Sequence, residues 1–536
     1  MTIHLEKVRT APVLRTKVDI TRFLQAHVRP ATGCTEPGAV AYAVAIAVHT
    51  ALGNLPRRQE DGAVVFNDGA DPVPLLLDKL KGIEISVDRD TMKNAAAVFI
   101  PGTKFQQGIL IAAALGAFCH PKGNLNLLEG VTQQTLSYAG RIAPKIVLKE
   151  ITDKTPVPTL DVRVTVKFVD REISVRLHYD HAFIEAISDG GIEVYSDQFV
   201  KPGRADHALP ETMTDVFQSV SRITDSDKVE LLNGLFRNLR IAFEGLINSY
   251  GLTIGREYLR QEFPERYDEV AAAPEKIFFL PDMDVFRLTR ILTAAAVDAR
   301  MGGAQFPVTS TSGSGNQGIA ATVPLIAVSS ALNLIDLEGN YTSAGLKLRT
   351  LLNKPADYVI TLEQLSRAAL FSHLIAAIAT SKIGVIGAWC GCATKAGLAS
   401  AAAVVYLLGG GEDQVHQAIN LMAANATGVI CDGAKPGCAL KLGADTPVQY
   451  ALMALRGGRI PPYNGIVDPD ALTTIDNIGR LSGTTHTTDQ TMVTILKEKY
   501  DDQRERVSDQ DKIIGFSTET GRSVLASDLR RLFKRE

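Results

Sequence analysis

The spacing of apolar and polar positions divides the chain into segments of different character. Residues 19–52 have the apolar spacing of a helix, which the run Ala-Thr-Gly-Cys-Thr-Glu-Pro interrupts at 31–37. Because proline suits the first turn of a helix, this run predicts a loop that opens into a second helix. Residues 54–74 are rich in Arg, Gly, Asn, Asp and Pro, which predicts a surface loop or hairpin. We expect a strand to end at 98–102 and a helix of small residues at 108–118.

Between residues 145 and 193 apolar and polar residues alternate. The runs DVRVTVKFV and REISVRLHYD are also rich in β-branched residues, which predicts antiparallel strands with one buried face. The stretch 200–212 contains Pro and Gly and is expected to link these strands to the next segment. Beyond residue 214 the pattern predicts helices to about residue 499, followed by a charged, solvated tail. Loops are expected at 261–275, 336–345 and 457–468.

Together these patterns predict an α+β fold. We expect an N-terminal α/β region at 1–144 that carries the Gly-Cys-Thr-Glu-Pro loop, and an antiparallel β subdomain at 145–213. A mainly helical catalytic domain with Ala/Gly-rich buried helices is expected at 214–536. The most apolar windows, 318–334 and 396–411, are shorter than the ~20 residues that a membrane span needs, and Gly, Ser, Thr and Pro interrupt them. They therefore predict buried core helices.

Composition and charge narrow the class of protein. Hydrophobic residues make up 46% and charged residues 21% of the 536 positions, which is ordinary for a soluble globular protein. A net charge of −3 offers no basic field for nucleic acid. The N-terminus lacks the apolar core of a secretory signal. We therefore expect a cytoplasmic enzyme, a homo-oligomer, with a small-molecule substrate and without nucleic-acid or membrane partners.

The cysteines are the first candidates for chemistry. They are too few for a disulfide scaffold and are expected to be thiols at positions 34, 119, 390, 392, 431 and 438. Two Gly and one Pro between Cys431 and Cys438 disfavour a regular helix, so the segment should curl and direct both thiols toward one centre. Thiolates are soft ligands for zinc or for an iron–sulfur cluster. Zinc ribbons need two tight cysteine pairs, so a three-cysteine cluster with one open iron suits the spacing better. Cys392 is an alternative to Cys390.

A second group of candidates precedes an apolar helix. Residues 309–318 read TSTSGSGNQG, and residues 298–304 read DARMGGA. Glycines let backbone N–H groups approach a ligand, and a following helix adds its positive end, so the loop predicts a site for an anion such as a carboxylate. A plain Gly/Ser turn is the alternative interpretation, and neither nucleotide-binding glycine motif is present. Polar residues at a strand boundary add further candidates. The candidate substrate-binding residues are Lys93, Asn94, Thr103, Arg300, Ser312, Ser314, Asn316 and Gln317.

In this order along the chain, the motifs resemble those of the L-cysteine desulfidase family, which is related to the α subunits of iron–sulfur L-serine dehydratases. The similarity runs from about residue 20 to about residue 495 and rests on the segments 33–37, 93–94 with 101–103, 298–303, 312–319, 389–390, and 431–434 with 438–441. The resemblance implies a [4Fe–4S] cluster held by Cys390, Cys431 and Cys438. It also implies that Cys34 acts beside the cluster, as base or as displaceable fourth ligand. Glu36 in the same loop is the second expected catalytic residue.

This resemblance implies β-elimination from a small amino acid. L-cysteine would give pyruvate, ammonia and sulfide, and L-serine would give pyruvate and ammonia. The open iron would act as a Lewis acid, and Cys34, with a pKa lowered by the cluster, would remove the α-proton. Cys392 and Lys395 depart from the family pattern, because small residues are common at both positions.

Two alternatives remain open. A pyridoxal-phosphate lyase with a Schiff base on Lys441 would explain the loop at 309–318 but would leave the cysteines unused. A non-enzymatic zinc or thiol-sensing protein would use the cysteines but not the loop. Iron and acid-labile sulfide analysis separates these alternatives from the iron–sulfur lyase.

Overall fold

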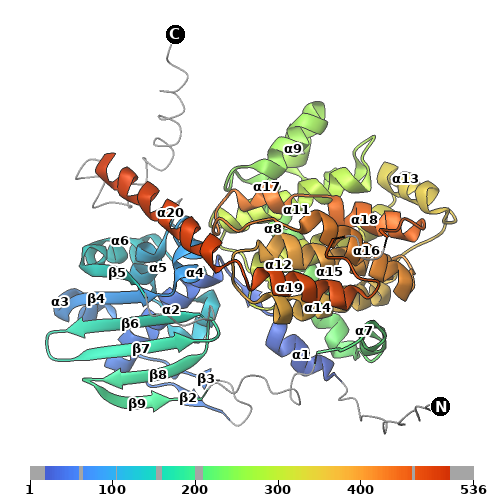
Figure 1. Ribbon diagram of the computed structural model, residues 1–536. Coiled ribbons are helices and arrows are strands. Elements are labelled where there is room, and N and C mark those ends of the chain that lie inside the picture. The colour runs from blue at the N-terminus through green and yellow to red at the C-terminus, as the bar shows by residue number, and fades with distance from the viewer. Residues whose placement is uncertain are drawn as a thin grey trace, which may run out of the picture.

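The structure, a computed structural model, describes residues 18–59, 64–103, 106–151, 160–198, 209–461 and 465–506. It has two lobes, one built around a mixed β-sheet and one built almost entirely of helices (Figure 1). Each lobe has its own cluster of buried hydrophobic residues. The predicted α+β fold with a mainly helical part is therefore confirmed.

The main sheet of the sheet lobe has six described strands in the order β5-β4-β6-β7-β8-β9. Their bounds are β4 Leu80–Val87, β5 Ile146–Glu150, β6 Asp161–Phe168, β7 Glu172–His178, β8 Ile184–Asp189 and β9 Ile192–Ser196. The predicted antiparallel pairing holds from β6 to β9, whereas β4 and β5 pair in parallel. Parallel neighbours need a long crossover, which the helices between β4 and β5 supply. One sheet thus joins strands from the regions predicted as 1–144 and 145–213, and the predicted domain division stays a prediction.

Helix α2, Thr35–Ala51, packs against β6 and β7. This packing fixes the position of its N-terminus, which carries the candidate residues Cys34 and Glu36. Every residue from Thr35 to Thr50 is buried, because Ala and Val occupy most positions around the helix. The predicted loop before α2 is confirmed. Helix α1, Ile20–His27, ends well before α2 begins, and only the short strand β1, Pro30–Ala31, lies between them. The remaining elements of this lobe are β2 Arg57–Arg58, β3 Val64–Val65, α3 Val73–Lys79, α4 Arg89–Ala95, α5 Ile109–Gly116 and α6 Gln133–Ile142, with 3-10 helices at Pro121–Gly130 and Ala143–Lys145. The antiparallel pairing of β2 with β3 agrees with the hairpin predicted within 54–74, and helix α5 confirms the helix predicted at 108–118.

Two local predictions are wrong. Instead of a strand at 98–102, the structure has a single bridge between Phe99 and Gln107, because the Pro-Gly pair at 101–102 turns the chain. Most of the loop expected at 261–275 is helical. The elements there are α9 Ile254–Glu262, a 3-10 helix at Pro264–Arg266, α10 Tyr267–Ala272 and a 3-10 helix at Pro274–Phe279. Pro264 and Pro274 each begin a helical turn. At the first position of a turn the missing N–H of proline leaves no hydrogen bond unmade, so neither proline forms the predicted loop.

The helical lobe surrounds α15, Gly391–Leu407, which packs against α12, α14, α16 and α18. This helix and α12, Gly315–Asn333, are buried along nearly their whole length, which confirms the predicted Ala/Gly-rich core helices. The other elements of the lobe are α7 Met213–Val220, α8 Asp225–Ile247, α11 Val285–Met301, β10 Val308–Thr309, α13 Ser343–Leu352, α14 Leu362–Ile383, α16 Glu412–Ala426, α17 Cys438–Leu442, α18 Thr446–Leu455 and α19 Ala471–Ser482. Within the described ranges, no helix combines the length and apolar character needed to cross a bilayer.

The two ends of the described chain both contribute contacts between the lobes. Strand β1 pairs with β10, and α1 contributes to the core of the helical lobe. At the other end of the chain, α20, His486–Arg506, leaves the helical lobe and packs against α4 (Figure 1). The N-terminus of α2 and the segment 93–94 are thereby held against the helical lobe.

Candidate active site between the lobes

A pocket between the lobes gathers most of the predicted site residues. Of these, its lining includes Cys34, Glu36, Asn94, Arg300, Ser314, Asn316, Gln317, Cys390, Cys431 and Cys438. They come from α2, α4, α11, α12 and the segments around α15 and α17. The lining does not include Lys93, Thr103 or Ser312. His181 and Lys395 also line it, and the sequence did not single out either as a site residue.

A short antiparallel bridge brings the first two predicted ligands together. Trp389 and Ile430 form a β-bridge. The Cys390 N–H donates to Val429 O at 2.8 Å, and the Cys431 N–H donates to Ala388 O at 2.7 Å. Two thiols that are far apart in sequence therefore leave neighbouring backbone segments. Cys438 begins α17 and faces the same pocket.

The protein alone holds these sulfurs as thiols. Burial, followed by the neighbouring sulfurs, raises the pKa of Cys390, and burial raises the pKa of Cys438 to about 12. Burial also raises the pKa of Cys431, although Lys93 opposes the shift. A bound metal centre deprotonates such groups, because its positive charge stabilises the thiolates.

The chemistry of these three donors can be compared with what an iron–sulfur cluster needs. Among the described residues, no group of three or more His, Cys, Asp or Glu side chains is arranged to hold one metal ion. Soft thiolates are the donors that such clusters use. The three cysteines therefore fit an iron–sulfur group.

Two further polar residues stand beside these thiols. Cys392 lies in the first turn of α15, with its Sγ 3.3 Å from Ser314 Oγ. The Lys395 ammonium donates to Gly384 O at 2.8 Å and to Val385 O at 3.2 Å, and burial lowers its pKa to about 8. Both residues line the pocket, so Cys392 remains an alternative ligand. A lone lysine inside an Ala/Gly-rich helix was the sequence signal that would have identified Lys395.

Cys34 and Glu36 form a hydrogen-bonded pair at the N-terminus of α2. The Cys34 thiol donates to Glu36 Oε2 at 2.8 Å, and Asn94 Nδ2 donates to Glu36 Oε1 at 3.0 Å. Burial opposes ionisation of Glu36, but the nearby His181 and these hydrogen bonds lower its pKa, so it is a carboxylate. Burial and the Glu36 charge raise the pKa of Cys34. The surrounding protein groups therefore raise the pKa of Cys34 and keep it a thiol. This is the opposite of the shift predicted from the sequence, a lowered pKa caused by a bound cluster.

Arg300 on α11 faces the start of α12. Its side chain is buried, and its Nη1 donates to Asn316 Oδ1 at 2.9 Å, while its Nε has no hydrogen-bond partner. Only glycine fits at position 315, because a Cβ there would lie 2.4 Å from Arg300 Nε. The buried atoms Gln317 Oε1 and His181 Nε2 also have no partner. The predicted anion loop thus ends at a helix N-terminus beside an arginine with an unused donor, which suits a carboxylate.

The three predicted residues outside the pocket have other partners. The Thr103 hydroxyl donates to Ile100 O at 2.7 Å and accepts from the Gln106 N–H at 3.1 Å. Ser312 Oγ lies 3.3 Å from His27 Nδ1. Lys93 is buried, and its Nζ donates to Gly387 O at 3.0 Å and to Asp489 Oδ1 at 2.5 Å. Lys441, the lysine of the pyridoxal-phosphate alternative, pairs with Asp432 at 2.5 Å.

Comparison with known proteins links the chain to one family. The serine dehydratase alpha chain family matches residues 123–497. A UPF0597 protein of Oleidesulfovibrio alaskensis is 33% identical over 467 residues, which cover 86% of this chain and 92% of the relative. UPF0597 proteins of Caldanaerobacter subterraneus subsp. tengcongensis and Latilactobacillus sakei are 30% and 32% identical, each over 86% of this chain and 94% of the relative. The family match spans the α12 loop and the three predicted cluster ligands.

Proposed function

The chain belongs to the serine dehydratase alpha chain family of lyase-type enzymes, and on this premise we propose a [4Fe–4S]-dependent β-elimination from L-cysteine or L-serine. One observation carries the proposal. Three thiols from two separate segments, a buried arginine with an unused donor, and a thiol–carboxylate pair line a single pocket. Neither alternative accounts for all three features. Lys441 is paired with Asp432, and a zinc protein needs no arginine-lined anion site.

Substrate binding would rest on the α12 end of the pocket. The Arg300 guanidinium and the N-terminus of α12 would hold the substrate carboxylate, with Asn316 orienting the guanidinium. The amide of Gln317 and the imidazole of His181 each have an unused buried atom for the amino group or the leaving group. Cys390, Cys431 and Cys438 would hold the cluster, which supplies a Lewis acid when bound.

Proton transfer would rest on the Cys34–Glu36 pair. Glu36 Oε2 already accepts the hydrogen bond of the thiol, so it is placed to receive that proton. A bound cluster would lower the pKa of the thiol, so the sulfur would then be free to take the α-proton while the carboxylic acid holds the first proton. Asn94 keeps the carboxyl group in this orientation through its bond to Oε1. The role of Cys34 as displaceable fourth ligand remains the alternative.

Anaerobic purification followed by iron and acid-labile sulfide analysis tests the cofactor. A panel of β-substituted amino acids, read out as 2-oxo acid, tests the reaction. Cys431→Ala should lose both the cluster and turnover, whereas Cys119→Ala, which changes a buried cysteine outside the pocket lining, should retain both. A Cys431→Ala protein with full iron content and normal rate would refute the assignment.

The expected cytoplasmic homo-oligomer stays a prediction. Light scattering can test the oligomeric state, and cell fractionation can test the compartment.

A further inference from the structure

Lys93 lies between the lobes, outside the pocket lining, with its side chain fully buried. Its Nζ donates to Asp489 Oδ1 of α20 at 2.5 Å and to Gly387 O at 3.0 Å. Asp90 Oδ1 lies 3.3 Å from the same nitrogen. Two carboxylates and one carbonyl oxygen thus surround the ammonium, and one carboxylate comes from near the C-terminal end of the described chain.

The segment 93–94 contacts both cysteine segments. Gly387, which accepts from the Lys93 ammonium, leads directly into the bridge that carries Cys390. The Lys93 backbone lies against Gly433, where a Cβ would be 2.5 Å from Lys93 O. The Cys431 thiol lies 3.9 Å from Asn94 Oδ1. A shift of this segment would therefore change the position of one cysteine segment relative to the other.

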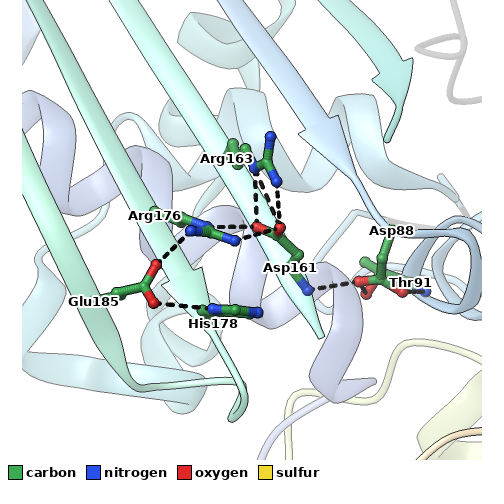
Figure 2. Close-up of polar contacts among 7 residues, drawn as sticks. All are labelled: Asp88, Thr91, Asp161, Arg163, Arg176, His178 and Glu185. Atoms are coloured by element: carbon green, nitrogen blue, oxygen red, sulfur yellow. Dashed lines mark hydrogen bonds and ion pairs between the residues drawn. The ribbon is translucent and has the colours of Figure 1, made fainter. Parts of the chain in front are cut away.

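Helix α4 is itself anchored to the sheet at its first turn, as Figure 2 shows. Asp88 caps the helix by accepting from the Thr91 N–H at 2.9 Å, and it also accepts from the Asp161 N–H of β6 at 2.9 Å. Arg163 and Arg176 hold the Asp161 carboxylate at 2.7 and 2.8 Å. The sheet thus fixes the start of α4, and Asp489 holds its last turn from the other lobe.

We propose that Lys93 and Asp489 form a positioning ion pair that sets the spacing between the Cys390 and Cys431 segments, so that docking of α20 prepares the pocket for its cluster. The inference rests on the proposed iron–sulfur function. A buried charge without its partner is strongly unfavourable, so without Asp489 the ammonium would move toward Asp90 and weaken its bond to Gly387. Groups behind metal ligands orient those ligands, and losing them typically costs about 10- to 100-fold in metal affinity.

Asp489→Asn removes the charge of the pair while keeping the size of the side chain. In the iron-free full-length protein, hydrogen exchange should accelerate at the Cys390 and Cys431 amides, which form the bridge between the two segments. After anaerobic reconstitution, we expect roughly a 10- to 100-fold weaker retention of iron during chelator challenge. Asp489→Glu should restore much of the retention because it returns the charge.

Asp476→Asn is the matched control, because it neutralises an exposed acid that pairs with Lys382 at 3.1 Å in the same lobe. It should leave both exchange at the bridge and iron retention unchanged. Should Asp489→Asn fail to fold, Asp90→Asn tests the same ammonium from the α4 side. Its expected effect has the same direction.

Three results would overturn the inference. They are native exchange at the bridge in Asp489→Asn, full iron retention in that variant, or acceleration spread evenly over the helical lobe, which would indicate general destabilisation. If the unaltered protein takes up no cluster, the proposed function fails instead. Accelerated exchange at the bridge of the iron-free variant would still support the ion pair, and native or slower exchange would refute it, so the two failures are distinguishable.

Discussion

Replacing Arg300 with lysine tests the substrate-binding part of the proposal most directly. The native side chain is 2% exposed, directs one nitrogen at Asn316 and leaves Nε without a partner beside Gly315. Lysine keeps the positive charge but replaces the planar fork with a single ammonium group. The substitution therefore removes the unpaired Nε donor while leaving the net charge of the pocket unchanged.

The size of the effect follows from the bond that is lost. A hydrogen bond to a charged group contributes about 1.5–3 kcal/mol, and each 1.4 kcal/mol corresponds to about tenfold in affinity. Losing one bond to the substrate carboxylate should raise KM by roughly 10- to 150-fold. We expect kcat to change much less, because the carboxylate is bound alike in the ground state and the transition state.

The assay is the anaerobic initial rate of 2-oxo acid formation over a range of L-cysteine or L-serine concentrations. Iron per chain must be measured on the same samples, so that cluster loss is not mistaken for weak binding. Arg290→Lys is the matched control, since Arg290 lies on the same helix and pairs with Glu262 away from the pocket. An unchanged KM for Arg300→Lys at full iron content, or a loss confined to kcat, would refute the assigned role.

Three further predictions concern the site and its support. Glu36→Gln should lower kcat with little change in KM or iron content, because a neutral amide is a poor proton acceptor; native kcat would exclude the proposed proton path. Gly318→Ala should destabilise the fold by about 1–3 kcal/mol, since its Cβ would lie 1.9 Å from Thr309 O, while Gly411→Ala, with open space around it, should be nearly neutral in thermal unfolding. Burial, with a smaller effect of the neighbouring His27, lowers the pKa of His373 from 6.5 to about 4. As the pH falls, His373 is therefore protonated in the unfolded chain before it is protonated in the folded protein. The free energy of unfolding should fall by up to about 3 kcal/mol as the pH drops from 6.5 to 4. Urea unfolding at several pH values should show a smaller loss for His373→Gln, and identical pH profiles would contradict this reasoning.

Local patterns in the sequence determined the helices and much of the site chemistry. Helices α12 and α15 could be predicted because small and apolar residues occupy nearly every position, which only a buried helix tolerates. The loops before α2 and α12 could be predicted because Gly and Pro are the residues that most often mark turns and loops in a sequence. Pro264 shows the limit of such signals, since the same residue can begin a helical turn or break one.

Only the tertiary structure decided which of these pieces meet. Lys93 and Asp489 are separated by 396 positions, and neither has a neighbour in sequence that indicates the other. The bridge beside Cys390 and the insertion of β4 between β5 and β6 are likewise contacts between distant segments. Hydrophobic periodicity reports which face of an element is buried, but not which partner buries it. The sequence by itself therefore determined the elements and the candidate chemistry, whereas packing of the two lobes decided that the thiols, Arg300 and the Cys34–Glu36 pair share one pocket.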